Sequence, residues 1–146
     1  MKIISSAFEN NTALPSKYTC EGEGFNPPLS FSEIPELTKS LVLIVDDPDA
    51  PIQTFVHWIL YNMDPKTNEI KENSIVQSAL RGKTSIENNL NYFAPCPPSG
   101  THRYFFRLYA LDTMLDLENP DAIELEEKMK EHILDKAELI GLYSKK

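Results

Sequence analysis

Short apolar segments separated by polar, proline-containing stretches run through the first two thirds of the chain. Three of them, residues 40–46, 55–63 and 101–112, are rich in β-branched, aromatic and leucine residues and predict strands. Residues 40–46 show no alternation of apolar and polar positions, which is typical of a strand buried on both faces. Residues 3–8, 29–31 and 74–76 carry weaker strand signals, and the rest of the polar stretch 64–100 predicts loop.

Side-chain alternation assigns faces within the two longer strands. In strand 55–63 it puts His57 on one face with Phe55, Ile59, Tyr61 and Met63. In strand 101–112 it puts His102 and Tyr104 on one face, close to the start of the strand. A buried histidine needs a hydrogen-bond partner, so we expect an aspartate on the strand beside His57.

The last third of the chain predicts one helix. Asn119 reads as a cap, Pro120 as the first helical residue and Asp121 as an acid in the first turn. Helical spacing then continues to residues 133–134, and residues 139–143 form a short apolar end. Together these patterns predict one all-β domain over residues 1–146, with a peripheral C-terminal α-helix.

Composition narrows the class of protein. The 146 residues are 41% hydrophobic and 25% charged, which suits one globular domain. The net charge of −8 excludes the basic surface of a free-standing nucleic-acid binder, so any bound anion needs a local pocket. No apolar stretch is long enough for a transmembrane segment, and no export signal is recognisable. We therefore expect a cytoplasmic protein in which Cys20 and Cys96 are reduced, buried thiols; a disulfide between them is the alternative.

Two clusters of residues indicate chemistry. Asp-Asp-Pro-Asp-Ala-Pro at residues 46–51 follows a buried strand, and Pro-Pro-Ser-Gly-Thr-His-Arg-Tyr at residues 97–104 leads into another. The imidazoles of His57 and His102, the Tyr104 phenol and loop amides are suited to holding a small anion such as phosphate. Asp47 would keep an imidazolium charged and oriented, with His57 as its expected partner, or would receive an ammonium group of the ligand.

These clusters resemble the signatures of the phosphatidylethanolamine-binding protein family, in the bacterial and archaeal branch called Raf kinase inhibitor-like proteins. Residues 47–51, His57 ahead of residues 61–63, and residues 97–104 carry the match, and residues 18–22 and 27–29 add a looser one. The resemblance implies a β-sandwich with Greek-key character and an anion pocket at one end. Carried over by position, the pocket residues are Asp47, Asp49, His57, Pro97, His102 and Tyr104. In this pocket we expect Asp49 to brace the loop through backbone amides and Pro97 to shape the wall.

Two departures from the family pattern concern the expected rim of this pocket. Ala94 stands where the family usually has glycine, and Thr84 stands where it usually has asparagine. We expect both changes to affect the choice of ligand more than the fold.

The resemblance implies a binding or regulatory protein without a cofactor. Its ligand would be a phosphate-type anion, such as phosphorylethanolamine or a phospholipid head group, and a kinase or protease would be a possible inhibited target. The alternative is a hydrolase in which Cys96 is the nucleophile, His57 or His102 is the base, and Asp47 orients the base. A metal site built from the two histidines and a carboxylate is disfavoured by the long spacing between them. A homodimer is left open.

Overall fold

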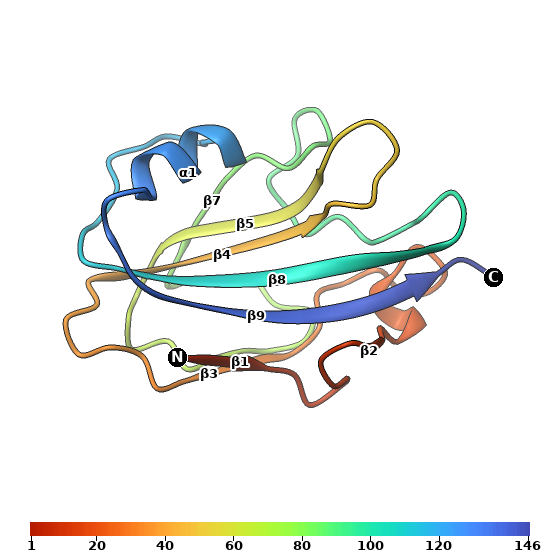
Figure 1. Cartoon of the computed structure of the whole chain (residues 1–146), viewed down its shortest axis with the longest axis horizontal. Helices are drawn as coiled ribbons and strands as arrows, with labels where there is room; N and C mark the ends of the chain where they lie inside the picture. The colour runs from red at the N-terminus through yellow and green to blue at the C-terminus, as the bar shows by residue number, and fades with distance from the viewer.

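The computed structural model describes all 146 residues, most of the regular structure being β-strand. A six-stranded sheet has the order β2-β9-β8-β4-β5-β7, and a three-stranded sheet has the order β1-β3-β6 (Figure 1). The strands of the large sheet are β2 (Thr12–Ala13), β4 (Ser40–Asp47), β5 (Phe55–Met63), β7 (Leu80–Arg81), β8 (Thr101–Leu111) and β9 (Ile133–Ser144). The small sheet contains β1 (Lys2–Ile4), β3 (Leu29–Ser32) and β6 (Glu69–Ile70). A 3-10 turn covers Ser16–Tyr18, and the helix α1 covers Ala122–Met129.

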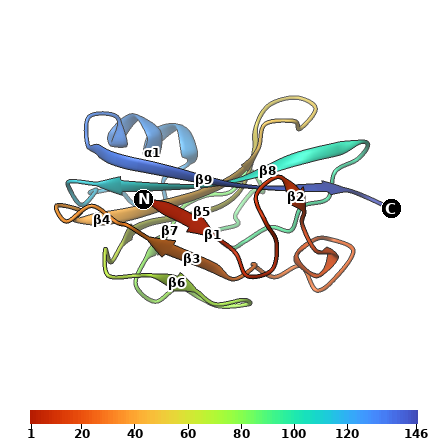
Figure 2. The same ribbon diagram turned by 60° about the horizontal axis from the view of Figure 1, so that its bottom comes forward.

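The small sheet and α1 lie on opposite faces of the large sheet (Figure 2). The face toward the small sheet contributes to a cluster of 19 buried apolar residues, among them Phe31 of β3 and Phe106 of β8. The other face packs against α1 through 8 buried apolar residues, including Leu125 of the helix. The fold is therefore mostly sheet with one short helix, as the sequence predicts; the two sheets do not close, and the Greek-key sandwich stays a prediction.

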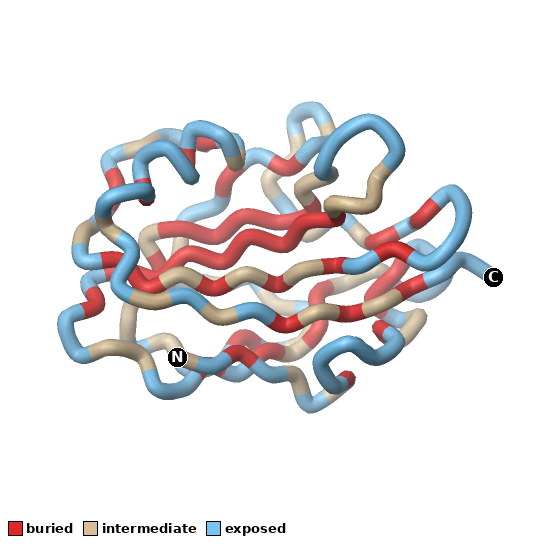
Figure 3. The backbone as a smooth tube through the Cα atoms, viewed as in Figure 1, coloured by how far each residue is buried: buried red, intermediate tan, exposed pale blue.

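Strand β4 is buried along its whole length, which confirms the prediction for residues 40–46 (Figure 3). Leu41, Leu43 and Val45 belong to the cluster that includes the small sheet, whereas Val42 and Ile44 belong to the cluster under α1. Because both faces of this strand are covered, apolar residues occupy successive positions.

Strand β5 departs from the predicted alternation because its pairing with β4 shifts register. Val45 pairs with Trp58 and Asp46 pairs with Val56, so His57 is the extra residue of a β-bulge. A second shift separates the pairs Leu41–Met63 and Leu43–Leu60. The prediction that residues 55, 57, 59, 61 and 63 share one face is therefore wrong, since each extra residue reverses the alternation beyond it.

The C-terminal third contains a long strand that the sequence analysis did not predict. Helix α1 ends at Met129, and residues predicted to continue it begin β9, which pairs antiparallel with almost all of β8. The helix also begins later than predicted, since Asp121 is the cap and its side chain accepts a hydrogen bond from the Glu124 N–H at 2.8 Å.

The weaker strand signals were only partly correct. Residues 3–8 give the short β1, residues 74–76 form no strand, and the predicted loop 64–100 contains β6 and β7. These pieces pair over two or three residues each, too short for a recognisable pattern. No helix of the structure has the length and apolar character needed to cross a membrane.

Candidate functional site

A cavity of about 330 Å³ lies where three neighbouring strands of the large sheet meet. Strand β4 runs antiparallel to both β5 and β8, so its last residues lie beside the first residues of its two neighbours. The residues that line the cavity are Asp47, Ala50, Pro51, Phe55, His57, Phe93, Cys96, Pro97, Pro98, His102 and Tyr104. Five of the six predicted site residues are among them, and Asp49 is not.

Asp47 is the partner of His102. Its Oδ2 lies 2.6 Å from the His102 Nδ1, and both side chains are almost completely buried, at 5% and 8% exposed. The other oxygen of Asp47, Oδ1, accepts a hydrogen bond from the Asp49 N–H at 2.8 Å. With Nδ1 engaged, Nε2 is the nitrogen of His102 that is left for a ligand, and it becomes a donor when the ring is protonated.

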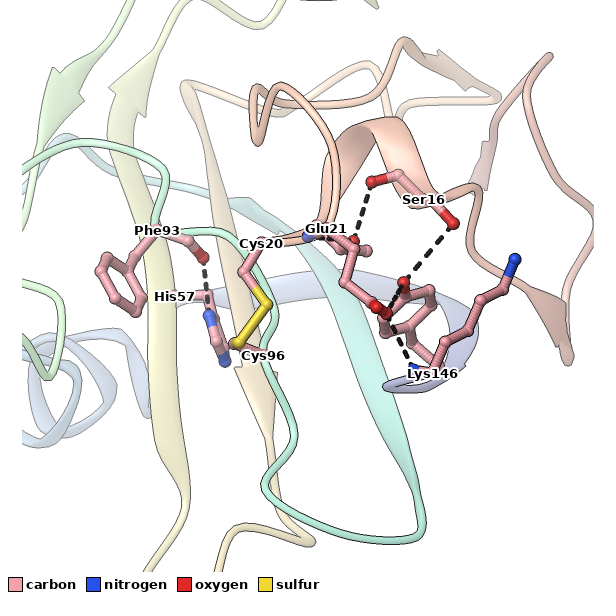
Figure 4. The surroundings of a disulfide bond; sticks show 9 residues. Ser16, Cys20, Glu21, His57, Phe93, Cys96 and Lys146 are labelled. Carbon is pink, nitrogen blue, oxygen red and sulfur yellow. Dashed lines mark hydrogen bonds between the residues drawn. A yellow bond between two sulfur atoms is a disulfide. The ribbon is translucent and has the colours of Figure 1, made fainter.

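His57 is held by a backbone carbonyl, so the prediction that Asp47 orients it is wrong. The His57 Nδ1 lies 2.7 Å from the Phe93 carbonyl oxygen, which can only accept, so Nδ1 is protonated (Figure 4). Burial lowers the pKa of His57 below its ordinary value, and the Phe93 carbonyl and the Asp47 carboxylate oppose this shift only in part. In the free protein His57 is therefore neutral near pH 7, with the lone pair on Nε2.

Tyr104, Phe55 and Phe93 complete the aromatic lining of the cavity. The His57 ring meets Tyr104 edge-on at 5.4 Å between centroids and lies 4.7 Å from the Phe55 ring. Phe93 stacks on His57 at 6.2 Å. Burial, with the Asp47 carboxylate as a second cause, raises the pKa of Tyr104, so the phenol keeps its proton and is available as a donor.

Asp49 braces the cavity from outside. Its Oδ2 accepts hydrogen bonds from the Arg103 backbone N–H and Nε, both at 2.9 Å, and its Oδ1 accepts from a terminal nitrogen of the guanidinium at 2.9 Å. These bonds from Arg103 hold the pKa of Asp49 below its usual range. The Asp49–Arg103 pair joins the loop after β4 to the start of β8, so Asp49 contacts the start of β8 through Arg103 and does not line the cavity.

The two cysteines form a disulfide, so the expectation of two reduced, buried thiols is wrong. The disulfide joins Cys20 and Cys96, whose Cα atoms lie 5.4 Å apart (Figure 4). Both residues are exposed. They lie 76 positions apart in the chain, and the tertiary fold brings the two loops together. In this state Cys96 has no thiolate to act as the nucleophile of the hydrolase alternative.

The two departures from the family pattern, Thr84 and Ala94, are not among the lining residues. Thr84 accepts a hydrogen bond from the Asn89 amide at 3.0 Å, and neither Thr84 nor Ala94 lines the cavity. Ala94 directly follows the lining residue Phe93, and the effect of these two changes on the cavity stays a prediction.

A larger groove of about 690 Å³ lies elsewhere, beside the start of α1. Its buried carboxylate, Asp46, already has a partner, because the Arg107 Nε lies 3.1 Å from its Oδ1. The smaller cavity is the better candidate because its buried imidazoles each keep a nitrogen for a ligand.

Phe55 and Phe93 are cavity residues that the sequence reasoning missed. Alternation alone gave Phe55 the same face as His57, which was a usable signal. Phe93 lies in an irregular loop, so no periodic pattern in the sequence predicts where its side chain lies.

Comparisons with known proteins match this architecture along nearly the whole chain. The family model described as phosphatidylethanolamine-binding protein matches residues 4–144. The chain belongs to the phosphatidylethanolamine-binding protein family. A UPF0098 protein of Methanothermobacter thermautotrophicus is 46% identical over 98% of both chains. The UPF0098 protein of Chlamydia trachomatis is 42% identical over 99% of both chains.

Solved structures agree with the family assignment. A crystal structure of a phosphatidylethanolamine-binding protein homologue from Chlamydia trachomatis has a TM-score of 0.94 and 41% identity, covering 99% of this chain and 97% of its own. Escherichia coli YbcL, described as a member of the mammalian family, has a TM-score of 0.90 at 23% identity, covering 99% of this chain and 98% of its own, and so shares the fold. The structure contains no cluster of three or more His, Cys, Asp or Glu side chains that could hold a metal ion.

Proposed function

We propose that this family member is a binding protein that reversibly holds a small phosphate-type anion, such as phosphorylethanolamine or a phospholipid head group, in the 330 Å³ cavity. The observation that carries the proposal is the state of the two buried imidazoles. His57 and His102 each have Nδ1 engaged by the protein and Nε2 left for a ligand. His57, His102 and Tyr104 line one cavity, and once an anion brings a proton to each free Nε2, the three side chains offer it up to three hydrogen-bond donors.

The surroundings of the cavity suit a ligand with more than a phosphate group. Asp47 supplies a negative charge that balances a protonated His102 and is also available to an ammonium group. Phe55, Phe93 and Tyr104 supply aromatic faces, which attract cations and apolar groups. A zwitterionic phosphate ester with a short amine matches this combination better than inorganic phosphate does.

Calorimetric titration of phosphorylethanolamine into the wild type and the His102→Ala variant tests the proposal. Loss of a charge-assisted hydrogen bond costs roughly 1.5–3 kcal/mol, so we expect binding at least tenfold weaker. The matched control is His132→Ala, because His132 forms a similar pair with Asp112, at 2.8 Å, that lies outside the cavity. Equal affinity of the wild type and His102→Ala would remove His102 from the site.

A further inference from the structure

One wall of the cavity consists of a loop with few attachments of its own. Residues 94–100 contribute Cys96, Pro97 and Pro98 to the lining. Only one hydrogen bond involves this segment, from the Cys20 N–H to the Pro95 carbonyl at 3.0 Å. Three of its residues are prolines, which have no N–H to donate. Besides this hydrogen bond and the packing of the buried Pro95 and Pro97, the wall is therefore held by the disulfide.

The other half of the disulfide is firmly anchored. The Thr19 hydroxyl donates to the Ser16 carbonyl at 2.8 Å, directly before Cys20. The Glu21 carboxylate, directly after it, accepts hydrogen bonds from the Tyr143 hydroxyl and from the Lys146 N–H, the latter at 3.1 Å (Figure 4). Cys20 is thus a fixed point to which the disulfide ties a loosely attached wall.

Both half-cystines are exposed residues, which favours access to the bond from solvent. A thiolate must reach a disulfide sulfur to exchange with it, and exposed disulfides are the ones that act in redox control. A dithiol reductant supplies two electrons and two protons. The Cys20–Cys96 bond breaks, each cysteine becomes a thiol, and the two sulfurs of the reductant join in a disulfide.

We propose that the Cys20–Cys96 disulfide controls the anion cavity: the oxidised protein holds the 94–100 wall in the binding geometry, and reduction by a dithiol releases the wall and weakens binding. This proposal rests on the proposed function of the cavity. Reduction leaves the binding-competent arrangement only partly populated, and the apparent affinity falls by that fraction. Linkage requires the reverse effect as well, so a bound anion favours the disulfide by the same factor.

The first test measures phosphorylethanolamine binding by calorimetry to the oxidised wild type, the dithiothreitol-reduced wild type and the Cys20→Ser/Cys96→Ser variant. We expect binding at least tenfold weaker in both proteins that lack the bond. Absence of binding to the oxidised protein would refute the proposed function itself. Equal binding, within twofold, to the oxidised and reduced proteins would overturn redox control and leave the cavity standing.

The second test uses the wild type alone and covers the case in which the double variant fails to fold. The fraction of disulfide is measured at equilibrium with reduced and oxidised dithiothreitol, with and without saturating phosphorylethanolamine. We expect the ligand to shift this equilibrium at least tenfold toward the disulfide, while near-ultraviolet circular dichroism shows that the reduced chain stays folded. No shift, or global unfolding on reduction, would overturn a control that acts through the wall of the cavity.

Discussion

Replacing Asp47 by alanine should destabilise the protein far more than a matched change at the surface. Asp47→Ala removes two acceptors at once, the Oδ2 that faces the His102 Nδ1 at 2.6 Å and the Oδ1 that faces the Asp49 N–H at 2.8 Å. Leaving a buried donor without a partner costs about 1–3 kcal/mol. Two such donors give about 2–6 kcal/mol, a large fraction of the stability of a domain of this size.

The control is Asp112→Ala. Asp112 pairs with His132 at 2.8 Å, but its side chain is 46% exposed and that of His132 is 44% exposed. Exposed pairs contribute about 0–1 kcal/mol, because water replaces the lost partner. Both pairs join an aspartate to a histidine Nδ1, and they differ in burial and in the second hydrogen bond, from the Asp49 N–H, that only Asp47 accepts.

Urea denaturation of both variants, with the disulfide intact, measures the difference in unfolding free energy. Similar m-values for the variants and the wild type would show that the unfolded states are comparable. If Asp47→Ala and Asp112→Ala agree within 0.5 kcal/mol, roughly the scatter of such measurements, Asp47 does not hold the cavity together and the argument is refuted.

Two further predictions concern pH and packing. Burial lowers the pKa of His57 in the free protein, and a bound anion raises it, so binding is accompanied by uptake of a proton. Sulfate, whose charge is constant from pH 5 to 9, should therefore bind more weakly as the pH rises through the pKa of His57 in the complex. His57→Gln should flatten this calorimetric profile, whereas an unchanged slope would contradict the role of His57. Gly22→Ala should destabilise the protein by roughly 1–3 kcal/mol and so lower the midpoint of urea unfolding, because the alanine Cβ would lie 2.5 Å from the Ser16 carbonyl oxygen. An unchanged midpoint would contradict this packing.

The long central strands were predictable because their burial patterns appear directly as patterns of apolar residues in the sequence. Strand β4 is covered on both faces and β8 alternates cleanly, with Tyr104, Phe106 and Leu108 buried on one side. Strand β9 was not predictable, since its exposed positions include Lys136 and Glu138 and its charges resemble those of a helix surface. Only the extended pairing with β8 makes it a strand.

The members of the site were easier to predict than their partners. Motifs with fixed spacing pointed to His57 and His102 as site residues. However, His57 lies at a bulge in β5 and pairs with the Phe93 carbonyl, whereas Asp47 pairs with His102. The disulfide joins residues 76 positions apart and depends on how two irregular loops meet. Neither the histidine partners nor the disulfide can be predicted from a local sequence pattern, because both arise from tertiary packing.

The most direct test of the anion cavity is an NMR titration of the histidine ring nitrogens in the oxidised protein. Phosphorylethanolamine should shift the Nε2 signals of His57 and His102 with one saturating curve, and inorganic phosphate should do so more weakly. The exposed His132 ring serves as the internal control and should not shift. If neither cavity ring responds to millimolar ligand, or if all three rings respond alike, the cavity does not bind phosphate-type anions.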